Sequence, residues 1–290
     1  MLIHKNKSKK NPSRVVILGA KGFVSGSVER RLFNMSTNIV SITRDNIDLT
    51  KLESQEKLSK ILKPDDTLFF AAAKAPVKNE NMLIQNLEMS KNVCEVLKTN
   101  PVSHLIYLSS DAVYSDSSYA LTEKSNAQPG SLHGAMHLTR EIMISQLTNI
   151  PQCFVRPTLI YGIDDPHNGY GPNRFVRLSR LNKDIELFGK GEEKRDHVWV
   201  EDVSKLISLI CYHKSIGTLN IATGNLISFF DIANNIIVKS KCSSKIIYLP
   251  RNGPMPHNGY RPFDIKNTLN SFPDFNYTSF DKAILEIIKK

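Results

Sequence analysis

His133 and His137 stand four residues apart at the start of a segment, 134–147, whose apolar pattern predicts a helix. Residues four apart on a helix share a face, so His137 is expected to lie beneath His133. An imidazole with its ordinary pKa of about 6.5 suits proton transfer at neutral pH. One histidine could therefore act as an acid and base, while the charge of the other disfavours its protonation. The same spacing permits a metal ion to bind, with Asp111 as a conceivable third ligand, but we expect no metal site.

A second group of residues could bind phosphate. The strand predicted at 15–18 contains only Val, Ile and Leu, as in strands buried on both faces of a parallel sheet. The glycines that follow permit a tight turn and the close approach of a pyrophosphate to the start of the next helix. Strand, turn, helix and a further strand at 38–42 come in the order of a dinucleotide-binding unit. The expected cofactor-binding residues of this turn are Gly19, Lys21, Gly22, Phe23 and Val24.

Alternating strands and helices must position these groups. Further strands are predicted at 67–71, 105–109 and 153–155, and helices at 51–62, 81–98 and 134–147. This alternation predicts an α/β fold with a Rossmann-type doubly wound parallel sheet and a smaller C-terminal substrate-binding lobe. We expect a basic disordered tail (1–13), a dinucleotide-binding Rossmann domain (14–161) and a mainly substrate-binding lobe (162–290), some of whose elements return to the Rossmann domain.

The composition narrows the class of protein. Of the 290 residues, 41% are hydrophobic and 23% charged, as in soluble globular proteins, and no apolar run reaches membrane-spanning length. The basic first residues precede no apolar segment, so they do not form a secretory signal. Four scattered cysteines favour a reducing cytoplasm and argue against a disulfide framework or zinc site. The net charge of +10 fits anionic substrates such as nucleotide diphosphates, and we expect no nucleic-acid or membrane partner.

Several motifs together resemble the extended short-chain dehydrogenase/reductase family, the NAD(P)-dependent sugar-nucleotide epimerases, dehydratases and reductases. The resemblance runs from about Arg14 to Asp264, and the order and spacing of the motifs carry it. The motifs are Gly19-x-x-Gly22, Asp48-Leu49-Thr50, Phe70-Ala71-Ala72-Ala73-Lys74, Asn86, Ser109-Ser110-Asp111-Ala112-Val113-Tyr114, Arg156-Pro157 with Tyr161-Gly162, and Gly189-x-Gly191 leading to Arg195-Asp196-His197-Val198.

The resemblance implies a nicotinamide dinucleotide cofactor and further residues that contact it. Asp48 would contact the adenine with Leu49 beside it, and a carboxylate can accept from the adenine amino group. Arg44 follows the second strand, where NADP enzymes place an arginine, so NADP(H) is favoured and NAD(H) is possible. Ser25 replaces the family's third glycine, which predicts altered packing of the following helix. The adenosine and ribose side would be lined by Ala71, Ala72 and Ala73.

The resemblance also implies catalytic and substrate-binding positions. The family uses a Ser or Thr after the fourth strand, here Ser110, and then Tyr-x-x-x-Lys on the next helix. His133 and His137 occupy the Tyr and Lys positions, so His133 would move the proton while His137 orients it or contacts the cofactor ribose. Asp111 is followed by Ala112 rather than the Glu of dehydratases, which makes 4,6-dehydration a poor fit. The expected substrate-binding residues are Lys74, Asn173, Arg174, Arg195 on the diphosphate, and Arg261.

The function expected from these features is epimerisation or keto-reduction of a nucleotide-activated sugar in the cytoplasm. A homodimer is expected, paired through the helices at 81–98 and 134–147, as family members often are. Because histidines replace both the Tyr and the Lys of the family's motif, other interpretations of the function stay open. The chain could be a dinucleotide- or sugar-nucleotide-binding sensor or scaffold, its histidines could be ordinary polar residues beside a cleft, or it could be a basic RNA-binding derivative of the fold.

Overall fold

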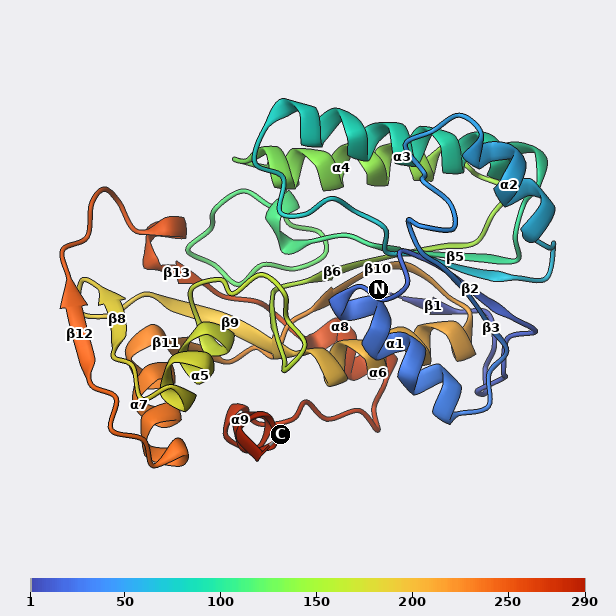
Figure 1. Ribbon diagram of the computed structural model, residues 1–290. Helices are drawn as coiled ribbons and strands as arrows, with labels where there is room; N and C mark the ends of the chain where they lie inside the picture. Colours follow the sequence, from blue (N-terminus) through green and yellow to red (C-terminus); the bar gives the residue numbers. More distant parts are fainter. Residues whose placement is uncertain (1, 290) are drawn as a thin grey trace. The chain divides into compact units, whose positions relative to one another are not determined.

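A computed structural model describes residues 2–289 of the chain (Figure 1). These residues divide into two compact units, and each is described by itself. Unit 1 comprises the residues up to Ser115, together with Glu123–Pro157 and Val203–Ile221. Unit 2 comprises Asp116–Thr122, Thr158–Asp202 and the residues from Ala222 onward.

A seven-stranded sheet is the centre of unit 1. Its strands are β1 (Ile3–His4), β2 (Val15–Leu18), β3 (Ile39–Ile42), β4 (Thr67–Phe70), β5 (His104–Leu108), β6 (Gln152–Pro157) and β10 (Ser215–Ile221). Their order is β1-β10-β6-β5-β4-β2-β3, and every pair is parallel except β1 with β10. The predicted Rossmann-type parallel sheet is thereby confirmed. Strands β2 and β4 are buried along their whole length, as their continuous apolar sequences predict.

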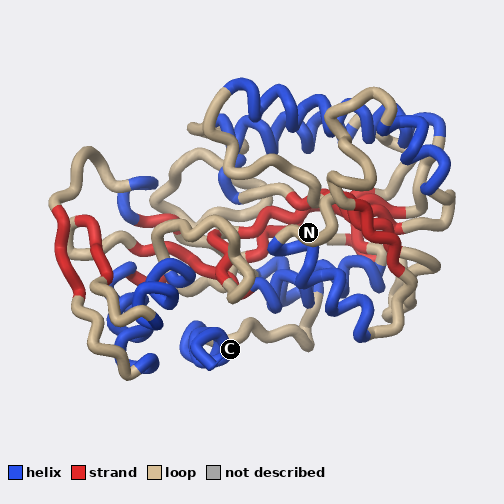
Figure 2. The backbone as a smooth tube through the Cα atoms, in the orientation of Figure 1, coloured by secondary structure: helices blue, strands red, loops and turns tan. Residues whose placement is uncertain are grey.

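Helices cover both faces of this sheet (Figures 1 and 2). On one face lie α2 (Ser54–Ile61), α3 (Glu80–Thr99) and α4 (Leu132–Ser145), and on the other lie α1 (Phe23–Asn34) and α6 (Val200–His213). A short 3-10 helix, η1 (Asp111–Val113), follows β5. The main hydrophobic core of the first face joins alternate strand residues to α3 and α4. It includes Val16, Leu18, Leu68, Phe70, Val93, Leu97 and Ile144.

The N-terminal segment differs from the expected disorder. Ile3 and His4 form β1, which pairs with Ile216 and Ser215 of β10. His4 Nδ1 also lies 2.8 Å from the Ser215 hydroxyl, and Asn6 donates through its side chain to the Tyr212 carbonyl. The physical reason is that β10 would otherwise leave a row of unpaired backbone groups at the sheet edge. The first residue of the predicted tail lies outside the described residues.

Unit 2 has a separate core between small sheets and helices. Its strands are β7 (Leu159–Tyr161), β8 (Ile185–Phe188), β9 (Lys194–Trp199), β11 (Leu226–Ser228), β12 (Ile246–Leu249) and β13 (Tyr260–Arg261). Its helices are α5 (Pro172–Arg180), α7 (Phe229–Ser240), η2 (Pro256–Gly259), α8 (Lys266–Ser271) and α9 (Phe280–Lys289). β9 pairs with β11, β13 and β7, while β8 pairs with β12. Side chains such as Tyr161, Phe175, Leu187, Phe229 and Ile232 fill the space between them.

Candidate functional site

The turn after β2 requires glycine. Gly19 has a φ of +86°, and a Cβ placed on it would come within 2.6 Å of the Ala72 Cα atom. The Ala71 amide donates to the Leu18 carbonyl at 3.0 Å, which draws the segments after β2 and β4 together. Lys21 is exposed and also has a positive φ of 68°. The turn is therefore a close-packed backbone cradle of the kind that admits a pyrophosphate.

The start of α1 follows directly from this turn. Gly22 is the N-cap of α1, and no side chain caps the first amides of the helix. Such uncapped backbone amides are favourable donors to an anion. Phe23 is the first helical residue, and Val24 is buried beneath it. Ser25 is also buried, and its hydroxyl donates to the Gly19 carbonyl at 2.6 Å. The residue that replaces the family's third glycine thus braces the turn with a hydrogen bond.

The residues expected around the adenosine lie after β3. Arg44 is 74% exposed and its guanidinium lies 3.5 Å from Asp48 Oδ2. Asp48 Oδ1 accepts hydrogen bonds from the amide and hydroxyl of Thr50, and these bonds lower the pKa of the Asp48 carboxyl. Leu49 is buried in the core, and its carbonyl accepts from the Asn92 side chain at 2.9 Å. An exposed cation and a carboxylate therefore flank this strand end.

The segment after β4 is fixed by a side chain of α3. Asn86 accepts from the Lys74 amide at 2.9 Å and donates to the Lys74 carbonyl at 3.0 Å. Ala71 and Ala72 are half-buried and Ala73 is exposed. The Lys74 ammonium group is exposed and donates to Gln85 at 2.9 Å. The Asn86 side chain thus fixes the backbone of a segment made of small residues.

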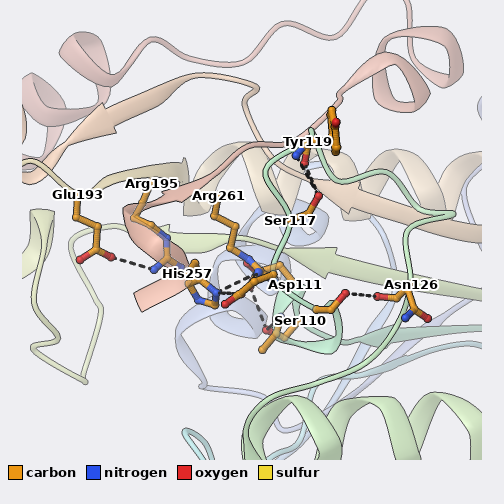
Figure 3. A network of polar contacts seen from close by, with 12 residues as sticks. Ser110, Asp111, Ser117, Tyr119, Asn126, Glu193, Arg195, His257 and Arg261 are labelled. Carbon is orange, nitrogen blue, oxygen red and sulfur yellow. Dashed lines mark hydrogen bonds and ion pairs between the residues drawn. The ribbon is translucent and has the colours of Figure 1, made fainter. Parts of the chain in front are cut away.

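Ser110 and Asp111 lie directly after β5, where η1 begins. The Ser110 hydroxyl oxygen accepts from the Ala112 amide at 3.1 Å and lies 3.4 Å from Asp111 Oδ1 (Figure 3). A Cβ on Gly134 would come within 2.0 Å of the Ala112 carbonyl oxygen, so the first turn of α4 packs tightly on η1. The glycine that follows His133 is therefore needed to bring the start of α4 to the segment that carries Ser110.

His133 and His137 stack edge to face on α4. Their ring centroids are 4.7 Å apart with planes at 86°, which confirms that the two residues share a face. His137 is buried, and its Nδ1 lies 2.8 Å from the Tyr107 hydroxyl of β5. Burial, followed by the charges of His133 and Arg140, holds the pKa of His137 well below its ordinary value. His137 is therefore neutral at physiological pH, whereas the lysine of the family's Tyr-x-x-x-Lys motif carries a charge.

Arg140 connects this helix to the glycine turn. It is fully buried, and its guanidinium donates to the Ala72 carbonyl at 3.0 Å and to the Ser90 hydroxyl at 2.5 Å. The guanidinium carbon lies 4.3 Å from the ring centre of Phe70 and 5.1 Å from that of Tyr107. Unit 1 thus joins the β4 segment, Tyr107 and the histidine helix through one side chain. Sequence reasoning missed this role, although an arginine three residues after His137 was an available signal.

A second buried network fixes the end of β5 and β6. Arg156 makes a bidentate pair with Glu141 at 2.9 and 2.5 Å, and the Ser109 hydroxyl donates to the same carboxylate at 2.5 Å. Arg156 also donates to the Tyr114 hydroxyl at 2.8 Å. These are fully partnered buried charges, which hold their neighbours in one geometry. They support the backbone that carries Ser110, and an Arg inside an apolar strand was the sequence signal for them.

Unit 2 contains a group of buried charges. Arg195 of β9 and Arg261 of β13 are Cα partners in adjacent parallel strands, and both side chains are almost fully buried. Arg195 donates to Glu193 at 3.3 Å (Figure 3). Arg261 donates to Asp116 at 3.1 Å. His257 also contacts the Asp116 carboxylate, a bond that is the main cause of the lowered pKa of Asp116. Asp116, Glu193 and His257 were not predicted, because they are far apart in the sequence.

The other two predicted substrate residues are used differently. The Asn173 side chain accepts from the Gly162 amide at 3.0 Å and donates to Asp165 at 2.9 Å, so it braces the loop before α5. Arg174 is 41% exposed and lies 4.0 Å from Glu186 of β8. These two residues thus lie at the start of α5, where their contacts are with the preceding loop and with β8.

Residues 2–289 were also considered as a possible metal-binding or membrane-spanning chain, and they show neither feature. Among these residues, no group of three or more His, Cys, Asp or Glu side chains is arranged to hold a metal ion. Within the same range, no helix combines the length and the apolar character needed to cross a membrane.

Comparisons with known proteins match this arrangement. The model of the NAD dependent epimerase/dehydratase family matches residues 15–222. A GDP-L-fucose synthase of Sinorhizobium fredii is 26% identical over 252 residues, covering 76% of this chain and 78% of that protein. A Thermus thermophilus UDP-glucose 4-epimerase in complex with NAD superposes with a TM-score of 0.81 at 18% identity, covering 95% and 98% of the two chains. A Naegleria fowleri GDP-L-fucose synthetase bound to NADP gives a TM-score of 0.82 at 14% identity, covering 99% and 94%.

Proposed function

Because this chain belongs to the NAD dependent epimerase/dehydratase family, we propose that it modifies a nucleotide-activated sugar by epimerisation or keto-reduction. The observation that carries the proposal is the packing of Gly19 against Ala72, with 2.6 Å between a Cβ on Gly19 and the Ala72 Cα. A turn that only glycine can occupy, directly before the start of a helix, is typical of segments that let the backbone approach a pyrophosphate. The same unit carries the His133–His137 pair, which would supply the acid–base chemistry.

The residues around the turn fit a nicotinamide dinucleotide. Gly19, Lys21 and the start of α1 would hold the pyrophosphate, and the segment 71–73 would line the adenosine and ribose side. When bound, this cofactor supplies or accepts a hydride. We propose NADP(H) as the preferred form, because the exposed Arg44 follows β3 and can reach a 2′-phosphate. The Asp48 carboxylate offsets part of the positive charge of Arg44, which would weaken its attraction for a 2′-phosphate. NAD(H) is therefore the alternative cofactor.

The proton chemistry falls to side chains of unit 1. His133 would take or give the proton of the sugar hydroxyl, because an imidazole can both accept and donate a proton. Ser110 would donate a hydrogen bond to the same sugar oxygen. Ala112 offers no carboxylate to remove a proton beside a ketone, which favours epimerisation or reduction over 4,6-dehydration. In the structure the Ser110 hydroxyl points to Asp111 Oδ1 at 3.4 Å, and it would turn from this carboxylate to the sugar oxygen when substrate binds.

Unit 2 would bind the diphosphate of the substrate. Guanidinium groups recognise phosphate by paired hydrogen bonds, and Arg195 and Arg261 stand side by side on neighbouring strands. We also propose a homodimer formed through α3 and α4, because Ile84 and Ile142 on these helices are each 56% exposed. A cytoplasmic location stays a prediction, as does the absence of nucleic-acid partners. Light scattering of the purified protein tests the dimer.

The first experiment is a fluorescence titration with NADP(H) and NAD(H), repeated with UDP-, GDP-, CDP- and dTDP-sugars. Dinucleotide binding together with a nicotinamide signal that changes on addition of one sugar nucleotide is the expected result. Binding without a redox change for any sugar would favour the sensor or scaffold. If no dinucleotide binds, the proposal is wrong.

A further inference from the structure

We propose that the Asp116 carboxylate is a built-in competitor of the anionic substrate group: it holds the place beside Arg261 and His257 until that group displaces it. The inference rests on the proposed function and deepens it, because it concerns the affinity of the arginine pair of unit 2 for a diphosphate. It is carried by the contacts of Asp116, by the exposure of its side chain and by the way the segment 116–122 is attached.

The Asp116 side chain meets two nitrogen donors through one oxygen. Its Oδ1 accepts a hydrogen bond from the Arg261 guanidinium at 3.1 Å and also contacts His257 Nδ1. Arg261 Nη1 and His257 Nδ1 are themselves 3.1 Å apart, so the three atoms form a triangle. Figure 3 shows the Arg195, Arg261 and His257 side chains directed toward one another. The carboxylate oxygen thus lies where a phosphate oxygen would accept the same charge-assisted bonds.

The two carboxylates beside the arginine pair differ in their access to solvent. The Glu193 side chain is 6% exposed and contacts Arg195 at 3.3 Å and Arg251 at 3.6 Å. The Asp116 side chain is 49% exposed, although its partner Arg261 is only 2% exposed. Separating a buried carboxylate from its guanidinium partners is costly, whereas a half-exposed carboxylate is readily hydrated. Glu193 is therefore the fixed counter-ion, and Asp116 is the one that an anion from solvent can replace.

The segment that carries Asp116 is anchored at its other end. Leu121 is buried, and its amide and carbonyl each make a 2.9 Å hydrogen bond to the backbone of the segment 262–264, which follows β13. Residues 117–120, all of which the structure describes, form no helix or strand. The Asp116 carboxylate can therefore move away from Arg261 while Leu121 keeps the segment attached.

The charges of this cluster give the exchange its consequence. Arg195, Arg251 and Arg261 carry three positive charges and Glu193 and Asp116 two negative ones, which leaves a net charge of +1. When a diphosphate replaces Asp116, the buried guanidinium groups keep an anionic partner before and after the exchange. The diphosphate must, however, compete with a carboxylate that is already in place. We expect this competition to weaken binding and so to ease the release of a product that carries the same diphosphate.

The test is calorimetric titration of the full-length protein with inorganic pyrophosphate, in about 0.15 M salt to screen distant charges. The binding event that belongs to this cluster is identified by its loss in Arg195→Met. Asp116→Asn removes the competing charge but keeps an oxygen that accepts from Arg261. We expect it to lower the Kd of pyrophosphate roughly threefold to thirtyfold, between the effects of an exposed and a buried charge-assisted bond.

Asp281→Asn is the matched control, because it removes a carboxylate of unit 2 that lies 3.2 Å from Lys239 and changes the net charge equally. It should leave Kd within about twofold, since exposed charges are screened by salt. Unchanged or weaker binding in Asp116→Asn would overturn the inference, because Asp116 would then not compete with the anion. Equal tightening in Asp281→Asn, or no binding event that Arg195→Met removes, would overturn it too.

A nitroxide spin label attached at Ser118→Cys reports the displacement directly. Cys242 is replaced by Ser in this protein, because the other three cysteines are buried. We expect the electron paramagnetic resonance lines to narrow when pyrophosphate is added, as Asp116 leaves its partners. The lines of the Asp116→Asn variant should be narrow without pyrophosphate. Lines that stay unchanged or broaden on addition of the anion would overturn the inference.

Neither measurement needs a dinucleotide or a sugar, so the inference and the proposed function can fail separately. Both expected results in a protein that binds no dinucleotide would sink the proposed function alone. An active epimerase or reductase in which Asp116→Asn does not tighten pyrophosphate binding would sink this inference alone.

Discussion

Arg195 and Arg261 lie directly opposite each other on the parallel strands β9 and β13, with both guanidinium groups nearly buried. Like charges in such positions destabilise a sheet unless each has a partner or an anion lies between them. Glu193 and Asp116 partner them one by one. We expect a substrate diphosphate to accept charge-assisted hydrogen bonds from both guanidinium groups.

Replacing Arg195 by Met should therefore weaken binding of the sugar nucleotide without changing dinucleotide affinity. Loss of a hydrogen bond to a charged group costs about 1.5–3 kcal/mol, or roughly tenfold to a hundredfold in Kd. Calorimetric titration with the nucleotide sugar found in the panel measures the change. Lys194→Met removes a cation at the neighbouring exposed position of the same strand and should leave Kd within about threefold. Equal effects of the two substitutions would contradict a specific role for Arg195.

His133→Ala should abolish turnover while dinucleotide affinity stays nearly intact. A positioned acid–base side chain contributes about 10²- to 10⁴-fold to the rate, and the His133 ring is expected to act on substrate rather than cofactor. Steady-state kinetics with fluorescence titration of the cofactor separate the two quantities. An unchanged rate in His133→Ala would remove this residue from the mechanism.

Gly19→Ala should remove dinucleotide binding. The added Cβ would meet the Ala72 backbone at 2.6 Å, and the φ of +86° is unfavourable for alanine. We expect at least about a hundredfold loss of affinity and a loss of stability of about 1–3 kcal/mol. Gly26→Ala is the matched control, because its Cβ would meet nothing closer than 3.8 Å inside α1. That change should leave binding intact and stabilise the helix by up to about 1 kcal/mol.

Arg44→Ala should change the choice of cofactor. If the exposed guanidinium contacts the 2′-phosphate, its loss should weaken NADP(H) roughly tenfold to a hundredfold and leave NAD(H) unchanged. The dissociation constants of NADP(H) and NAD(H) are measured on the same Arg44→Ala protein, so the NAD(H) value serves as the control for the NADP(H) value. A parallel loss for both cofactors would mean that Arg44 acts on the strand end, through its contact with Asp48.

The free energy of unfolding should fall as the pH is lowered below 6.5, the pKa of an unperturbed histidine. His104 is buried in β5 and donates through Nε2 to the Ser215 carbonyl, and burial lowers its pKa from 6.5 to about 4. Above pH 6.5 the ring is neutral in both states, so it adds no pH dependence. Below pH 6.5 the unfolded chain takes up a proton that the folded chain refuses until about pH 4, so unfolding is favoured.

The expected loss from this one residue is on the order of 3 kcal/mol by pH 4. His137 and His197 have lowered pKa values and contribute with the same sign. Urea unfolding at several pH values measures the slope. His104→Gln should have a flatter slope between pH 6.5 and 4 than the unaltered chain, although it is less stable at pH 7. Identical slopes would show that His104 is not buried in its neutral form.

Local sequence predicted the parts of the site that depend on local rules. The glycine turn, the apolar strand 15–18 and the i, i+4 histidine pair each follow from spacing alone, and the structure has them in place. Helix and strand bounds differ by only a few residues, because caps such as Ser131 and Asn79 lie just outside the apolar pattern.

The rest could not be read from the sequence because it depends on long-range contacts. Tyr107 and His137 are 30 residues apart, and Asp116 and Arg261 are 145 apart. Nothing local distinguishes Tyr107 from any aromatic residue of a buried strand. Likewise, Leu49 follows the pattern of a cofactor segment, yet its side chain belongs to the core. Those pairings arise only when the sheet brings the strand ends together.

The short strand β1 has a consequence for how the protein behaves at high concentration. A parallel sheet that ended at β10 would present a full row of backbone groups on which another chain could grow. β1 covers that row with an antiparallel strand of only two residues, too short to template a further one. The lysines that follow, from Lys5 to Lys10, place repelling charge beside the same edge. The basic N-terminal segment thus works against self-association by edge-to-edge growth, a role that its composition alone would not suggest.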